Sequence, residues 1–86
     1  MAGNEEKILI YAELSQFYSL RNKYSKMLDE AAEAIFLADK AKLHFYAAAN
    51  YVSLADNFMQ LYDYDTAESL LERALAYEIP PEGIGR

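Results

Sequence analysis

One spacing of aromatic, small and aliphatic residues occurs twice in this chain of 86 residues, forty positions apart. In each copy these residues recur at helical intervals, stop for about six positions and then resume, which is typical of two antiparallel helices joined by a short turn. The first copy consists of Tyr11, Leu14, Ser15, Tyr18, Tyr24, Met27, Ala31 and Ala34, and the second of Tyr51, Leu54, Ala55, Phe58, Tyr64, Ala67, Leu71 and Ala74. The repeat therefore predicts an all-α fold of two antiparallel helical hairpins, and it points to binding rather than to catalysis.

The chain is predicted to form a single helical domain spanning residues 1–86. The first hairpin is expected over about residues 8–38 and the second over about 48–80, with a flexible tail at 81–86. Asn22 tolerates the left-handed backbone that ends a helix, so a turn is expected after Leu20. The pair Pro80-Pro81 is expected to stop the last helix.

Composition excludes several other classes of protein. The chain is 53% hydrophobic with only three glycines and two prolines, which is too apolar for a disordered segment and too poor in turn residues for an all-β fold. It has no cysteine, and its N-terminus is acidic where a signal peptide would be basic. We therefore expect a cytoplasmic protein that does not enter a membrane.

The second copy, from Ala48 to Pro80, resembles a tetratricopeptide repeat. It has an aromatic residue at Tyr51, the pair Leu54-Ala55, an aromatic residue at Phe58 and, after the turn, Ala67, Leu71, Ala74 and Pro80. The first copy follows the same order less closely. The resemblance implies paired helices that stack into a curved array, whose concave surface holds a segment of a partner protein.

Three departures from the family pattern affect this prediction. Tyr62 stands where the family has a glycine, and a tyrosine does not readily adopt a positive φ angle, so another turn geometry is expected there. The period is forty residues, where the family has about 34. Residues 24–61 also lack glycine and proline, so an alternative fold remains open in which one long central helix, flanked by two short helices, dimerises.

The partner-binding residues are predicted from the resemblance and from the expected end of the array. The first helix of each hairpin would line the concave surface, and no third hairpin follows to cover the end of the second. The candidates are Ala12, Gln16, Ala49, Val52, Asp56, Met59, Gln60, Leu75 and Tyr77, with Leu9, Ser19 and Leu20 completing the concave lining. This surface is apolar and mildly acidic, so we expect a partner helix with apolar anchors and basic residues, or a second copy of the chain in a homo-oligomer.

No catalytic, cofactor or metal site is predicted. His44 is the only histidine and no cysteine accompanies it, so the usual zinc and nucleophile combinations cannot be assembled. The formal net charge of −6 disfavours nucleic acid as a partner, because such binding needs clustered basic side chains. The predicted function is a small adaptor or assembly subunit. The alternatives are a dedicated chaperone of a secreted or assembly-prone protein and an acidic inhibitor protein of viral origin.

Overall fold

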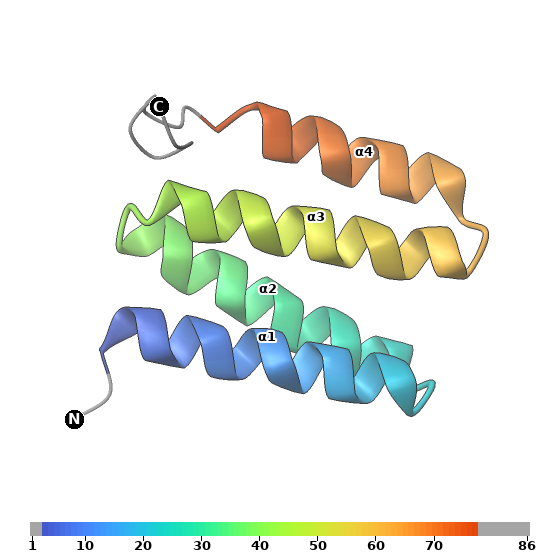
Figure 1. Ribbon diagram of the computed structural model, residues 1–86, viewed down its shortest axis with the longest axis horizontal. Helices are drawn as coiled ribbons and strands as arrows, with labels where there is room; N and C mark the ends of the chain where they lie inside the picture. Colours follow the sequence, from blue (N-terminus) through green and yellow to red (C-terminus); the bar gives the residue numbers. More distant parts are fainter. Residues whose placement is uncertain (1–2, 78–86) are drawn as a thin grey trace.

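A computed structural model describes residues 3–77 of the chain and shows four helices arranged as two antiparallel hairpins (Figure 1). The helices are α1 (Asn4–Leu20), α2 (Tyr24–Lys40), α3 (His44–Gln60) and α4 (Tyr64–Leu75). Residues 3–77 contain no strand, so the predicted all-α class is confirmed for this range. The predicted flexible tail at residues 81–86 and the proline pair lie outside the described residues.

The helices pack in chain order, with α2 near the centre of the molecule. The closest pairings are α1 with α2 and α3 with α4, while α2 and α3 join the two hairpins (Figure 1). The alternative with one long central helix is wrong, because the chain turns at residues 41–43 between α2 and α3. The polar stretch around Lys42 lacks glycine and proline, yet it separates two helices of seventeen residues each.

The three connections have the same backbone geometry and lie twenty residues apart. Asn22, Lys42 and Tyr62 have φ angles of 60°, 59° and 63°, in the left-handed region. In each turn two amides donate to the end of the preceding helix. Lys23 N donates to Tyr18 O (2.8 Å) and Asn22 N donates to Ser19 O (3.0 Å), and the same pair of bonds recurs around Lys42 and Tyr62. This is the Schellman helix ending, which satisfies carbonyls that the helix leaves free.

The expectation that Tyr62 would force a different turn is wrong. Its backbone adopts the left-handed conformation that glycine usually takes, and its side chain is 79% exposed. The two hydrogen bonds of the helix ending, together with the packing of α3 on α4, outweigh a local cost of roughly 1–2 kcal/mol for a residue with a Cβ. The turn geometry therefore depends on tertiary packing as well as on residue type.

The core consists of two clusters that both include residues of α2. One cluster joins Ile8, Ala34, Ala38 and Ala47 from three helices, and the other joins Met27, Ala31 and Leu54. Small residues allow close helix contact, as the repeat predicts: Ser15, Ala55 and Ala67 are all buried. Ser15 Oγ donates to the carbonyl oxygen of Met27 at 2.8 Å, so α1 and α2 nearly touch at this point.

The left-handed turn residues provide a test of the strain in this fold. Lys42→Gly keeps the turn and relieves the steric cost of a Cβ at φ 59°. We expect the free energy of unfolding to rise by about 0.5–1 kcal/mol, because the relieved strain exceeds the extra chain entropy of glycine. Urea unfolding followed by circular dichroism measures this. Lys42→Ala is the matched control and should change stability little, because it removes the charge but keeps the Cβ. Equal effects of Gly and Ala would show that the turn is unstrained.

Candidate protein-interaction site

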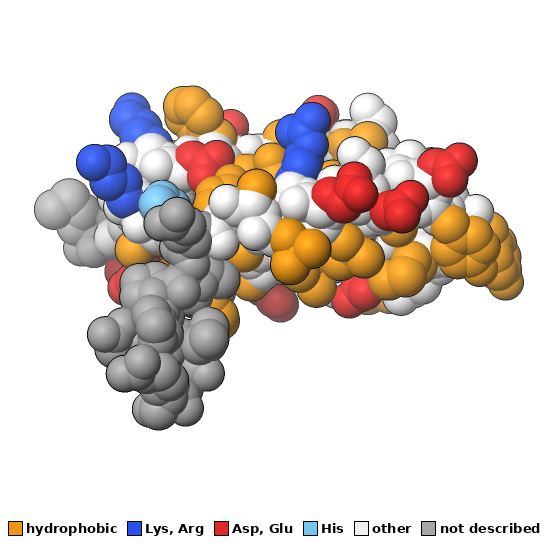
Figure 2. Space-filling model, turned by 90° about the horizontal axis from the view of Figure 1, so that it is seen from above, with side chains coloured by type: hydrophobic (Ala, Val, Ile, Leu, Met, Phe, Trp, Pro, Cys, Tyr) orange, Lys and Arg blue, Asp and Glu red, His pale blue; other side chains and the backbone are white. Residues whose placement is uncertain are grey.

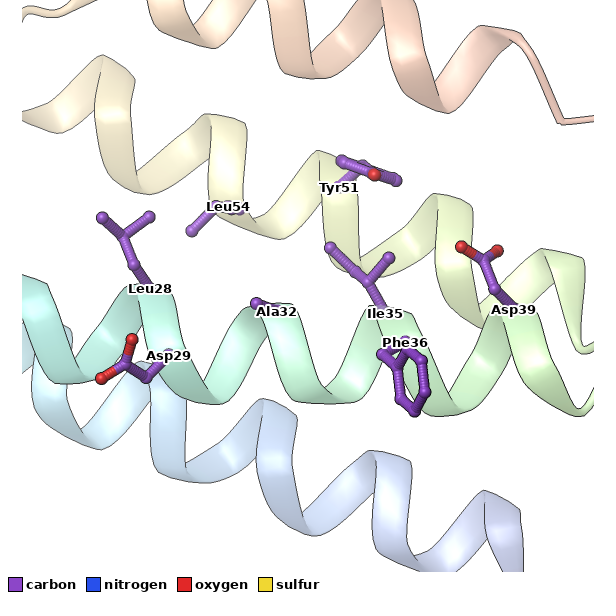
Figure 3. Close-up of a pocket in the computed structure, with 8 residues that line it drawn as sticks. All are labelled: Leu28, Asp29, Ala32, Ile35, Phe36, Asp39, Tyr51 and Leu54. Carbon is purple, nitrogen blue, oxygen red and sulfur yellow. The ribbon is translucent and has the colours of Figure 1, made fainter.

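An apolar groove runs along α2 with α3 beside it, and its volume is about 510 Å³ (Figure 3). Within the groove Leu28 is 39% exposed and Phe36 is 58% exposed, although both are large apolar side chains. The lining, called here the α2–α3 groove, comprises Leu28, Asp29, Ala32, Ile35, Phe36 and Asp39 from α2 and Tyr51 and Leu54 from α3. A groove of this composition suits the apolar face of a helix.

One carboxylate lies at each end of the α2–α3 groove. Asp29 and Asp39 are ten residues apart on α2, which corresponds to about 15 Å along the helix axis. Figure 3 shows the two carboxylates at opposite ends with the apolar side chains between them. The ammonium group of Lys40 lies 6.0 Å from the ring centroid of Phe36 and adds positive charge near the Asp39 end. Asp29 is therefore the stronger attractor for a basic group.

Tyr77 connects the end of α4 to the junction of α2 and α3. Its hydroxyl donates to Asp39 Oδ1 at 2.7 Å, and its ring lies 5.7 Å from that of His44 and 6.0 Å from that of Tyr51. Burial raises the pKa of Tyr77 well above its ordinary value, and the hydrogen bond to the negatively charged Asp39 raises it further. The Tyr77 hydroxyl, which the sequence predicts to contact a partner, is thus hydrogen-bonded within its own chain.

The structure places only some of the predicted concave-lining residues next to one another. A hollow of about 230 Å³ joins Ser19 and Leu20 of α1 to Gln60 of α3, and Ser19 Oγ donates to Asn57 Oδ1 at 3.3 Å beside it. The other predicted lining residues do not belong to this hollow. Ala12 is half-buried, and the exposed ones are Leu9, Gln16, Ala49, Val52, Asp56 and Met59.

Large apolar side chains are exposed on α1 as well as on α4, where the sequence placed them. Leu75 is exposed as predicted, at 85%, and α4 also exposes Tyr64 (60%) and Leu71 (36%) beside its polar side chains. Its exposed side chains include Asp65, Glu68, Ser69, Glu72 and Arg73. Figure 2, which views the molecule from above, shows acidic side chains over one half of this face.

Sequence reasoning missed the α2–α3 groove, although α2 carried a signal for it. Apolar residues at Leu28, Ala32 and Phe36 form a second stripe beside the core stripe of Met27 and Ala31. Because α2 packs between α1 and α3, part of this broad apolar surface is used against its neighbours. The residues that remain exposed, Leu28, Ala32 and Phe36, are those that line the groove.

Among residues 3–77, no group of three or more His, Asp or Glu side chains is placed to hold a metal ion. None of the helices described is long and apolar enough to span a bilayer. No family model matches the chain, and neither a curated protein nor a solved structure matches it.

The Tyr77–Asp39 hydrogen bond predicts a specific dependence of stability on pH. Tyr77→Phe should lower the free energy of unfolding at neutral pH by about 0.5–1 kcal/mol, the low end for a solvent-accessible bond to a charged acceptor. Because the pKa of Tyr77 is raised in the folded state, this contribution is complete below the ordinary tyrosine pKa of 10.0 and is lost as pH rises through the folded-state pKa. Urea unfolding at about pH 7 and at successively higher pH above 10 measures it. Tyr62→Phe, at an exposed tyrosine, is the control. A Tyr77→Phe variant as stable as the parent protein at neutral pH would contradict the prediction.

Proposed function

We propose that this chain is a non-catalytic protein–protein interaction module, an adaptor or assembly subunit that binds a helical segment of a partner in the α2–α3 groove. The observation that carries the proposal is the groove itself, about 510 Å³ in volume, apolar along its length and acidic at both ends. A partner helix would bury apolar anchors against Leu28 and Phe36 and would place a basic residue near Asp29.

The energetics favour apolar anchors as the main source of affinity. Leu28 and Phe36 are eight residues apart on α2, so they present two sites about two turns apart along the helix and about 80° apart around it. Covering such a side chain contributes up to about 1.5–3 kcal/mol before the entropic cost of association. A surface charge pair with Asp29 contributes less, and it mainly selects the direction in which the partner binds.

The resemblance of the second hairpin to tetratricopeptide repeats supports the class of function but suggests a different surface. It implies binding on the concave side, at Val52, Asp56 and Met59, which makes that side the alternative site. The absence of cysteine fits a module that works in the reducing cytoplasm. The two surfaces are separable by mutation, because their exposed apolar residues lie on different helices.

The proposal is tested with a fluorescently labelled amphipathic peptide that has leucines on one face and a lysine at one end of it. We expect this peptide to bind the parent chain, and the double variant Leu28→Asp/Phe36→Asp to weaken binding at least tenfold, since both apolar contacts are lost. Fluorescence anisotropy measures binding and circular dichroism confirms that the helices are retained.

The matched control is Val52→Asp/Met59→Asp, which alters two similarly exposed apolar residues on α3. It should leave binding of the peptide unchanged. If the control abolishes binding and the groove variant does not, the partner binds the concave side. A peptide with glutamate in place of the lysine should bind more weakly, and this difference should disappear in Asp29→Asn.

A further inference from the structure

Helix α1 has apolar residues on two opposite sides, and only one of them is buried. Ile8 and Ser15 face α2, whereas large apolar side chains on the other side remain exposed. These residues, called here the α1 outer face, are Leu9 (51% exposed), Ile10 (56%), Phe17 (50%) and Leu20 (84%). A helix that is apolar all round is typically covered on both sides, so α1 lacks one neighbour among the described residues.

The charges along α1 specify what this neighbour can be. Glu6, Ile10, Phe17 and Arg21 follow one another at intervals of four, seven and four residues, which keeps them within about 60° on the helix. An acidic group therefore stands at the start of the stripe, a basic group at its end, and two apolar groups between them. The guanidinium of Arg21 lies 5.8 Å from the ring centroid of Phe17, so it borders the apolar part directly.

Such a stripe is complementary to itself when it is reversed. If two α1 helices pack antiparallel around a two-fold axis, Glu6 of each copy meets Arg21 of the other, and Ile10 meets Phe17. We propose that the α1 outer face binds the same face of a second copy of this chain, which makes the protein an isologous homodimer. This surface is distinct from the α2–α3 groove and leaves the groove open.

Net charge is compatible with a second copy at this face. From Asn4 to Lys23 the chain has three acidic and three basic residues, so the α1 region is neutral although the whole chain has a net charge of −6. Helix α4 has three acidic residues, Asp65, Glu68 and Glu72, and α2 and α3 lie between it and α1 (Figure 1). Contact through α1 therefore keeps the α4 helices of the two copies apart, where their repulsion is screened.

Glu13 is the one charged group in the middle of the stripe. It lines the same shallow hollow, of about 500 Å³, as Leu9, Ile10 and Phe17. It lies between Leu20 and Phe17 around the helix, inside the α1 outer face. In the antiparallel arrangement the Glu13 carboxylates of the two copies come near the two-fold axis, so they repel each other, and the apolar contacts and the two end pairs have to outweigh this repulsion.

A charge-reversal experiment tests the dimer with sedimentation velocity at tens of micromolar protein. The parent chain should sediment as a dimer. Glu6→Arg alone and Arg21→Glu alone should each weaken dimerisation about tenfold or more, because each replaces two attractive contacts in the symmetric interface by two repulsive ones. An equimolar mixture of the two variants should restore the dimer, because the heterodimer again pairs opposite charges at both ends.

This rescue separates the proposed dimer from effects on the fold of one chain. Each reversal also places an unfavourable charge at an end of α1, and mixing cannot repair that defect. A parent chain that remains monomeric at these concentrations, or single variants that do not recombine on mixing, would overturn the proposal. A parallel arrangement would show no rescue, because residue 6 would then meet residue 6.

The apolar part of the interface has its own pair of variants. Ile10→Glu should yield a monomer, whereas Leu75→Glu, at an exposed leucine at the other end of the array, should leave the dimer intact. If Leu75→Glu yields a monomer and Ile10→Glu leaves the dimer intact, the interface lies at α4 and the proposal is wrong. Binding of the groove peptide to Glu6→Arg should equal that of the parent chain, so failure of the dimer and failure of the proposed groove function are distinguishable.

Discussion

Three helices of this protein end in the same pair of backbone hydrogen bonds, and this ending sets the direction of each helix that follows. The residue after each helix has a positive φ angle, which reverses the chain within three residues. Because the endings lie twenty residues apart, α1, α2 and α3 each have seventeen residues. Helices of equal length align side by side, so the two core clusters can form at the two ends of the same helices.

The regular spacing has a consequence for the surface, because an array of hairpins always has two ends. The two ends of this protein differ in the side chains that they expose. The exposed side of α4 combines acidic residues with Leu71 and Leu75, whereas the α1 outer face is mainly apolar and has charges of opposite sign at its two ends. The hydroxyl of Tyr77 donates a hydrogen bond to Asp39 and so connects the end of α4 to α2.

The α2–α3 groove and the α1 outer face therefore have separate roles in our proposals. The groove is acidic at both ends and is complementary to a basic helix of another protein. The α1 region is neutral overall, and its outer face is complementary to the same face of a second copy. In a dimer through α1 each copy would retain its own groove. Such an arrangement would offer two sites to a partner that has two helical segments, and linked sites bind more tightly than separate ones.

The sequence alone determined the all-α class, the two hairpins and the small residues at close helix contacts, because these follow from the period of the apolar residues and from side-chain volume. It misjudged Tyr62, since residue preference disfavours a conformation that packing and two hydrogen bonds impose. It named Tyr77 as a candidate partner contact without indicating its hydrogen bond to Asp39, and it did not indicate Leu28 and Phe36 as groove residues. Those assignments depend on which side of each helix its neighbours cover, and local periodicity does not contain that information. Only the packing of α2 between α1 and α3 decided which apolar side chains became core and which remained exposed.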